Sequence, residues 1–123
     1  MNALLVIAHG SRREASNIEV FELTKRLEEK VNARYQIVSA GFLEMAEPDI
    51  SASIKSCIDD GAKEIDVLPF FLSAGRHVVN DIPEELAAVT DNFPDVKVNV
   101  LPYVGGVDMM LDLMVGICLQ DEA

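Results

Sequence analysis

The sequence predicts an α/β domain: a four-stranded parallel sheet with helices on both faces. Four short apolar runs alternate with four helical patterns along the chain, and this alternation is typical of parallel strands joined by right-handed crossovers. The 123 residues are enough for one domain of ordinary size, so residues 1–123 are expected to form a single unit. Because both faces need covering, the expected strand order is 2-1-3-4, a short flavodoxin-like arrangement.

The four predicted strands are short and rich in apolar and β-branched residues. The first is an unbroken apolar run, and the third has Ile65, Val67 and Leu68 at its centre. Such runs are typical of strands buried on both faces of a sheet. The predicted strands span residues 3–8, 35–42, 64–70 and 96–101.

Two helices are expected between the first three strands. The first shows apolar residues at the three- and four-residue intervals of an amphipathic helix, with charged residues turned outward. The second begins near Pro48, a residue favoured in a first turn, and ends at Gly61. The predicted stripe of the first helix consists of Val20, Leu23, Leu27 and Val31.

Two more helices are expected after the third strand. Asp81 and Glu84 have the spacing of a helix cap, Pro83 fits the first turn, and Pro94 ends the pattern. The last helix follows Gly105 and is apolar over far more than one stripe. A helix of that kind packs on two sides, so it is either buried within this domain or meets a partner subunit on one side.

The composition excludes several classes of protein. Ten Lys and Arg against 21 Asp and Glu give a net charge of −11, whereas nucleic-acid binders cluster positive charge. No apolar run approaches the roughly 20 residues that a membrane span needs, and no secretory leader pattern follows Met1. The expectation is therefore a cytoplasmic protein without nucleic-acid or membrane partners. Cys57 and Cys118 lie far apart in helical patterns and are expected to be buried free thiols.

Three side chains able to bind a metal lie just beyond predicted strands. His9 follows the first strand, His77 lies in the loop after the third, and Glu44 follows the second. The carboxyl ends of parallel strands share one edge, and ligands bind there at the switch point between strands one and three. Imidazole suits Co²⁺, Ni²⁺, Fe²⁺ and Zn²⁺, and a carboxylate adds an oxygen ligand or a proton acceptor.

More ordinary roles are open for each of these residues. A single histidine in such a loop is more often a helix cap or a hydrogen-bonded surface group than a ligand. That both histidines, His9 and His77, fall at the crevice favours a shared functional site. Glu44 is equally well explained as a solvated loop carboxylate.

Basic residues gather at the same edge of an otherwise acidic chain. Ser11, Arg12 and Arg13 follow His9, and Arg76 precedes His77. Guanidinium groups bind carboxylates and phosphates well, so an anionic ligand is indicated. The alternative is that these arginines pair with neighbouring carboxylates of the chain, Glu14, Glu44 or Asp81.

Three segments of the chain resemble the small sirohydrochlorin chelatases of the CbiX type, relatives of the class II tetrapyrrole chelatases. They are residues 4–13 (LLVIAHGSRR), 41–48 (GFLEMAEP) and 68–83 (LPFFLSAGRHVVNDIP). The resemblance implies a chelatase half-domain that inserts Co²⁺, Fe²⁺ or Ni²⁺ into the tetrapyrrole sirohydrochlorin, with no organic cofactor.

The same resemblance assigns roles to the candidate residues. His9 and His77 match the paired active-site histidines, which hold the metal and accept protons. Glu44 matches the family's acidic residue, although Glu47 lies only three positions away. On this assignment, substrate carboxylates are bound by Ser11, Arg12, Arg13 and Arg76.

Two other functions stay open, and both use the same residues. A carrier of metal or tetrapyrrole would bind without turnover. A histidine phosphatase would aim the arginines beside His9 and His77 at one phosphate. In the chelatase reading, a broad planar macrocycle needs walls on both sides while one chain supplies a single crevice edge, so a C₂ homodimer is expected.

Overall fold

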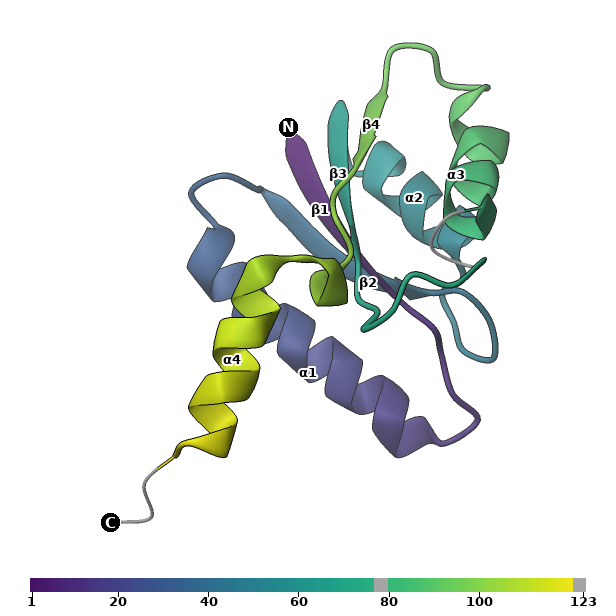
Figure 1. The fold of residues 1–123 in the computed structure, drawn as a ribbon. Coiled ribbons are helices and arrows are strands. Elements are labelled where there is room, and N and C mark those ends of the chain that lie inside the picture. The colour runs from purple at the N-terminus through teal and green to yellow at the C-terminus, as the bar shows by residue number, and fades with distance from the viewer. Residues whose placement is uncertain (77–79, 121–123) are drawn as a thin grey trace.

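The four strands form one parallel sheet in the order β2-β1-β3-β4 (Figure 1). The computed structural model describes residues 1–76 and 80–120. The predicted topology is confirmed, and β2 and β4 are each two residues shorter than expected. The strands are β1 (Asn2–Ala8), β2 (Ile37–Phe42), β3 (Glu64–Pro69) and β4 (Lys97–Val100).

Helices cover the two faces of the sheet unequally. α2 and α3 pack together on one face, whereas α1 lies on the other (Figure 1). A 3₁₀ turn, η2, follows β4, and α4 leads away from it. The helices span Glu14–Val31 (α1), Ile50–Asp59 (α2), Ile82–Thr90 (α3) and Asp108–Cys118 (α4), and η2 spans Val104–Gly106.

The main core lies between the sheet and the α2–α3 pair. Alternate side chains of β1 and β3 point into it, and each fully buried Leu or Ile contributes about 1.5–3 kcal/mol to folding. Asp49 caps α2 by accepting a hydrogen bond from the Ala52 amide at 2.8 Å. The largest core side chains include Leu5, Ile7, Ile50, Ile54, Ile65, Val67 and Ile82.

The predicted stripe of α1 is only partly correct. Leu23 is 42% exposed, and the residue buried instead is Thr24, whose hydroxyl donates to the Val20 carbonyl at 2.8 Å. Phe21 turns toward Phe42, with ring centroids 5.3 Å apart. The cause is that α1 packs mainly on β2, so that within the described residues no second helix packs extensively on the side that carries Leu23.

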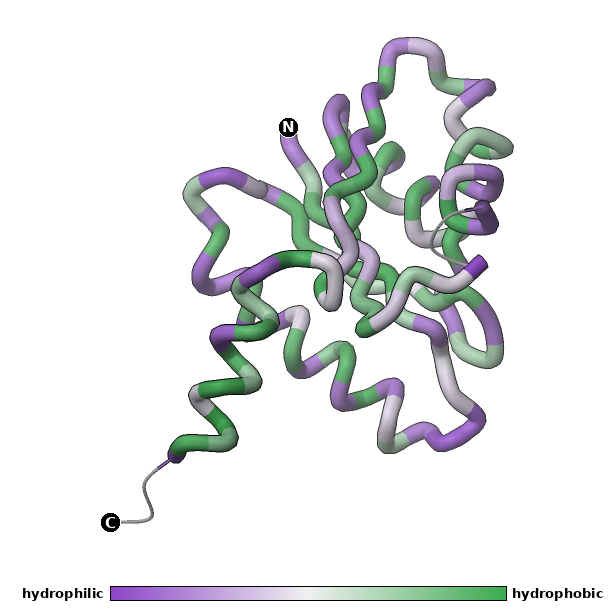
Figure 2. Tube along the Cα trace, in the orientation of Figure 1, coloured by the Kyte–Doolittle hydropathy of each residue, from purple (hydrophilic) through white to green (hydrophobic). Residues whose placement is uncertain are grey.

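Two expectations about the later helices are corrected. Asp81 occupies the N-cap of α3, but its side chain makes no capping hydrogen bond. α4 is not buried within this domain: it is a largely hydrophobic segment that projects away from the sheet (Figure 2), and most of its apolar side chains are exposed. Cys118 at its end is exposed, whereas Cys57 is buried as predicted. Burial raises the pKa of the Cys57 thiol, which keeps it protonated.

No helix among residues 1–76 and 80–120 is both long and apolar enough to cross a bilayer. This agrees with the short apolar runs in the sequence.

A buried polar network stabilises the α1 face of the sheet. Tyr35 donates to Asp66 Oδ2 at 2.5 Å, and the Asn99 amide donates to Asp66 Oδ1 at 3.0 Å. Burial alone would raise the pKa of Asp66, but these two donors and the nearby Arg34 charge together lower it. Asp66 is therefore a buried carboxylate with its hydrogen-bonding capacity well used.

Replacing Tyr35 with phenylalanine is expected to destabilise the fold by about 1–2 kcal/mol at pH 7, because Asp66 loses its shortest hydrogen bond. The pKa of Asp66 is lower in the folded chain than in the unfolded chain, where it is about 3.9, so the charged carboxylate stabilises the fold above that pH. This stability is lost as the pH falls through the folded-state pKa. Tyr35→Phe should therefore lose less stability on acidification than the unaltered chain. Urea unfolding at pH 7 and pH 3.5, at one fixed protein concentration, measures both effects.

The exposed Arg34 provides the control, since its guanidinium lies 3.7 Å from Asp66 Oδ2 and remains in solvent. Arg34→Gln should change the free energy of unfolding less than Tyr35→Phe does. Equal acid sensitivity in Tyr35→Phe and the unaltered chain would show that this hydrogen bond does not set the stability of the network.

Candidate functional site

The candidate site lies at the carboxyl edge of the sheet, beyond the ends of the neighbouring strands β1, β2 and β3. His9 follows β1 directly, and Glu44 follows β2 by two residues. β1 is hydrogen-bonded to both β2 and β3, so the loops after all three strands meet there. This is the position at which open parallel sheets bind ligands.

His9 and Glu44 face each other across this edge. His9 Nε2 lies 3.4 Å from Glu44 Oε1, and the two side chains are 45% and 48% exposed. His9 Nδ1 lies 3.1 Å from the Gly10 carbonyl oxygen. A carbonyl only accepts, so Nδ1 carries the proton, and in the neutral ring Nε2 presents its lone pair to the carboxylate. Two facing acceptors favour a shared proton or a cation between them.

Main-chain hydrogen bonds hold the two residues in register. The Leu43 amide donates to the Ala8 carbonyl at 2.9 Å, and the Glu44 amide donates to the His9 carbonyl at 3.1 Å. The β1–α1 and β2–α2 loops are thereby joined as a continuation of the β1–β2 ladder. The placement of His9 beside Glu44 thus comes from the backbone.

Gly10 makes this close approach possible. Its φ is +95°, and a Cβ at this position would overlap the Glu44 carbonyl oxygen. Only glycine combines that conformation with so close a contact. Gly10 was not singled out from the sequence, because nothing local to it shows this contact.

An aromatic side chain borders the pair. The Phe71 ring meets the His9 ring edge to face, with centroids 6.5 Å apart and an interplanar angle of 78°. The Phe70 amide donates to the Ile7 carbonyl at 2.8 Å, which ties the start of this loop to β1. The contact limits the orientations open to the imidazole.

Ser11 has a clear structural role in this structure. Its Oγ accepts from the Arg13 amide at 3.0 Å, and its amide and carbonyl are both bonded to the Asn17 side chain, at 3.0 and 2.8 Å. These bonds order the turn that starts α1. Contact of Ser11 with substrate stays a prediction.

The predicted basic residues are exposed. Arg12 and Arg13 lie in the loop before α1, and Arg76 lies in the segment between β3 and α3. Within the described residues, no salt bridge involves any of these three. The alternative in which they pair with Glu14, Glu44 or Asp81 therefore finds no support among the described side chains.

His77 lies outside the described residues, so its distance from His9 stays a prediction. Glu47 is exposed and has no ion pair with a described residue. Among the described candidates, the structure thus brings together His9 and Glu44.

An acidic pocket beside Glu44 was missed by the sequence reading. It has a volume of about 320 Å³ and is lined by Leu43, Glu44, Asp81, Glu84 and Glu85. Burial, with added repulsion from Asp49 and Asp81, raises the pKa of Glu85. Asp81 and Glu84 were interpreted only as a helix cap and Glu85 was not singled out, although carboxylates gathered this way also attract cations.

In the described part of the chain, a metal ion would be bound by two side chains, His9 and Glu44, rather than by a complete set of ligands. Across residues 1–76 and 80–120, no group of three or more His, Cys, Asp or Glu side chains is arranged to hold a metal ion. An imidazole nitrogen and one carboxylate oxygen suit a divalent first-row metal that is held briefly and released.

Comparison with known proteins identifies the family of the chain. Residues 3–116 match the family model CbiX. The chain belongs to the CbiX family. The match includes the loops that carry His9 and Glu44.

Two curated relatives show the range of the family. A sirohydrochlorin cobaltochelatase of Methanocaldococcus jannaschii is 43% identical over 94 residues, which are 75% of this CbiX chain and 63% of that protein. A chloroplastic sirohydrochlorin ferrochelatase of Arabidopsis thaliana is 34% identical over 113 residues, 92% of this chain and 49% of that protein. The chain spans less than two thirds of each.

A solved structure confirms the chelatase fold. The sirohydrochlorin chelatase SirB of Bacillus subtilis subspecies spizizenii, in complex with cobalt, superposes with a TM-score of 0.84 and 28% identity. The superposition covers 99% of this CbiX chain and 51% of that one. Family membership thus favours the chelatase reading over the histidine phosphatase alternative.

Proposed function

We propose that the chain is a sirohydrochlorin chelatase, an enzyme that inserts a divalent metal into a tetrapyrrole. The observation that carries the proposal is His9 Nε2 facing Glu44 Oε1 at 3.4 Å, at the carboxyl edge of a chelatase fold. The relatives named as sirohydrochlorin cobaltochelatases and ferrochelatases support the same reaction.

The reaction exchanges one metal ion for two protons. Two pyrrole N–H bonds break, four ring nitrogens bind the metal, and two protons leave for groups on the protein or for water. The Nε2 lone pair of His9 holds the incoming ion or accepts a proton, and Glu44 assists as ligand or acceptor. His77 is proposed from the sequence as the second imidazole. No organic cofactor takes part in this scheme.

The charge distribution suits both substrates. The carboxylates of the acidic pocket, Asp81, Glu84 and Glu85, lie next to Glu44 and attract the cation. Arg12, Arg13 and Arg76 are proposed to bind the peripheral carboxylates of the macrocycle, which guanidinium groups bind well. The negative carboxylates and the positive guanidinium groups would thus bind the metal ion and the macrocycle at different parts of the site.

Co²⁺ is the favoured metal, with Fe²⁺ and Ni²⁺ as alternatives. The cobaltochelatase of Methanocaldococcus jannaschii and the cobalt complex of SirB support this order. One imidazole and one carboxylate accept all three ions. Insertion rates measured at equal free concentrations of the three metals, without oxygen for Fe²⁺, would rank them.

We further propose that the active species is a C₂ homodimer acting in the cytoplasm. His9 and Glu44 are each about half exposed, so one chain offers one wall to a planar macrocycle. A second copy would supply the opposite wall.

Replacing Glu44 with glutamine is expected to lower the rate of metal insertion by about 10- to 100-fold, because the amide neither takes up a proton nor carries the charge that holds the cation. Glu47→Gln, three positions away, provides the matched control and should retain a near-normal rate. The change in the tetrapyrrole absorption spectrum on metallation measures both.

The reverse outcome, a large loss in Glu47→Gln and none in Glu44→Gln, would transfer the acidic role to Glu47. Sirohydrochlorin binding with no acceleration over the spontaneous rate in the unaltered protein would instead support the carrier alternative.

A further inference from the structure

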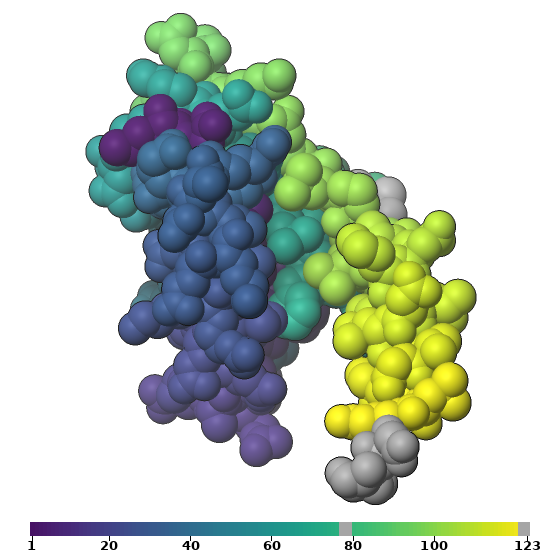
Figure 3. Space-filling view, turned by 90° about the vertical axis from the view of Figure 1, so that its left-hand side faces the viewer, coloured from purple at the N-terminus to yellow at the C-terminus, as the bar shows by residue number. Residues whose placement is uncertain are grey.

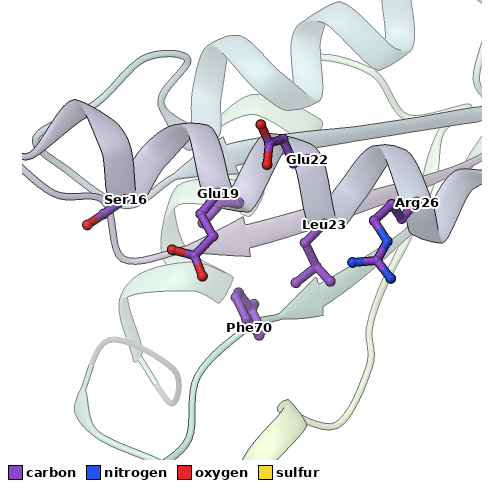
Figure 4. Close-up of a pocket in the computed structure, with 7 residues that line it drawn as sticks. Ser16, Glu19, Glu22, Leu23, Arg26 and Phe70 are labelled. Atoms are coloured by element: carbon purple, nitrogen blue, oxygen red, sulfur yellow. The ribbon is translucent and has the colours of Figure 1, made fainter.

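The β3 loop, residues 70–75, enters the candidate site through two adjacent aromatic residues. Phe70 lies toward α1, where it lines a groove beside that helix (Figure 4). Phe71 lies toward the opposite face of the sheet, packs against the main core and meets the His9 ring edge to face. Beyond Phe71 the residues of the loop are exposed. The position of Phe71 against His9 therefore depends on what holds the main chain of the loop.

That main chain is held from two directions. The Phe70 amide donates to the Ile7 carbonyl at 2.8 Å, on the side of β1, and the Gly105 amide donates to the Phe71 carbonyl at 2.9 Å. Gly105 belongs to η2, which lies beside the loop in Figure 1. In the space-filling view the yellow-green atoms that follow β4 also meet the teal atoms of β3 and its loop (Figure 3). The fourth strand, which does not pair with β1, thus reaches the site through this turn.

Gly105 lies very close to the backbone of the loop. A Cβ added to Gly105 would overlap the carbonyl group of Leu72 and lie 2.6 Å from its Cα. These are main-chain atoms, so no rotation of a side chain relieves the overlap. The φ of Gly105 is outside the left-handed region, so glycine is required here by the lack of space rather than by the backbone conformation. Any other residue at this position has to displace the backbone of Leu72.

We propose that Gly105 is a positioning residue of the candidate site. Because it has no side chain, η2 can hold the β3 loop where the Phe71 ring packs against the His9 imidazole. The inference rests on the metal insertion proposed above, in which the His9 lone pair meets the ion or a proton. Gly105 acts through Phe71 rather than by touching a substrate.

The orientation of His9 is what this arrangement controls. His9 Nδ1 lies 3.1 Å from the Gly10 carbonyl oxygen, and Nε2 faces Glu44 Oε1 at 3.4 Å. The Phe71 ring limits the rotation of the imidazole from the side of β3. Because a displacement of about 1 Å can cost 10²-fold in rate, a shifted loop is expected to slow metal insertion even though every reacting group is still present.

Gly105→Ala, made in the full chain, tests this role. It is expected to lower the rate of metal insertion by about 10- to 100-fold and to change the NMR signals of the His9 imidazole, which depend on the ring current of Phe71. The chain has two histidines, so His9→Ala identifies the signals of His9. A loss of stability alone would leave those signals unchanged in the folded protein, so the spectrum separates positioning from destabilisation.

Gly106→Ala is the matched control in the same turn. An added Cβ at Gly106 would lie 2.7 Å from Cε1 of the Tyr103 ring, and the three nearest atoms all belong to that side chain, which can rotate. Gly106→Ala should therefore keep a near-normal rate and the His9 signals of the unaltered chain. Equal losses of rate in the two glycine variants, with unchanged His9 signals in both, would show that η2 serves stability alone and would overturn the proposal.

A double substitution tests whether Gly105 acts through Phe71. Phe71→Leu keeps an apolar side chain and removes the ring, so it should change the His9 signals and lower the rate by about 10-fold. If one contact carries both effects, adding Gly105→Ala to Phe71→Leu should cost little more than the worse single substitution does. Losses that multiply, or a normal rate in Phe71→Leu, would overturn the route through Phe71.

Amide exchange in the unaltered chain tests the same contact should Gly105→Ala not fold. The Gly105 amide is expected to exchange more slowly than the Gly75 amide, which is bonded to Ser73 within the exposed part of the loop. Equally fast exchange would overturn the proposal. Normal insertion by Gly105→Ala would also overturn it and leave the chelatase function standing. An unaltered chain that inserts no metal would instead refute that function, while the His9 signals would still report whether Gly105 positions the ring.

Discussion

Replacing His9 with alanine is expected to lower the rate of metal insertion into sirohydrochlorin at least 100-fold. The substitution removes the Nε2 lone pair that faces Glu44 at 3.4 Å, and a positioned acid–base group commonly contributes 10²–10⁴-fold. It also removes a proposed metal ligand, so the loss should appear in both kcat and the KM for the metal. Stopped-flow or steady-state absorption at several metal concentrations separates the two.

Added imidazole distinguishes lost chemistry from lost structure. His9 is 45% exposed, so the site left by His9→Ala is open to a small base, and imidazole should restore part of the rate. His77→Ala, made in parallel, should lose activity to a similar degree if the second imidazole acts in the same step. Near-normal rates in both variants would remove the histidines from the mechanism, whereas lost activity with lost secondary structure would point to the fold.

Replacing Gly10 with alanine is expected to be almost as damaging, although this residue has no side chain to offer. The left-handed φ of +95° is strained for alanine, which costs about 1–2 kcal/mol, and the new Cβ would collide with the Glu44 carbonyl oxygen. The two loops would have to separate. Because a displacement of about 1 Å can cost 10²-fold in rate, both the free energy of unfolding and the rate should fall, measured by urea unfolding and the spectral assay.

Two other glycines separate the possible causes. Gly61 has a similar φ of +103°, but the nearest atom to an added Cβ, Met1 Sδ, is 3.7 Å away. Gly61→Ala should therefore lower stability and keep the rate. Gly75, where an added Cβ meets nothing within 4 Å, should tolerate alanine in both respects. Full activity in Gly10→Ala would show that the approach of these loops does not matter for the reaction.

The sheet could be predicted from the sequence because each strand is marked by a local apolar pattern. Apolar runs as short as residues 3–8 permit little besides a buried strand, and the handedness of crossovers leaves few ways to order four of them. The same logic placed His9 near Glu44, since both follow strands that are neighbours in the sheet. Here local pattern and global fold agree.

The errors share a different cause. Leu23 was expected to face the core, and α4 was expected to be buried either within this domain or against a partner subunit; within the single chain both face outward. Periodicity shows that a side chain seeks an apolar neighbour and does not show whether that neighbour belongs to the same chain. Gly10 escaped notice for a related reason, because its role depends on a carbonyl 34 positions away in the sequence.

The backbone bonds between the His9 and Glu44 loops separate two tasks that active sites often combine. The positions of His9 and Glu44 are set by backbone N–H and C=O groups, which every residue type except proline can provide. The groups proposed to contact the ion are supplied by the side chains at positions 9 and 44. A substitution at either position can therefore change the chemistry of the site while the main chain keeps the two positions side by side.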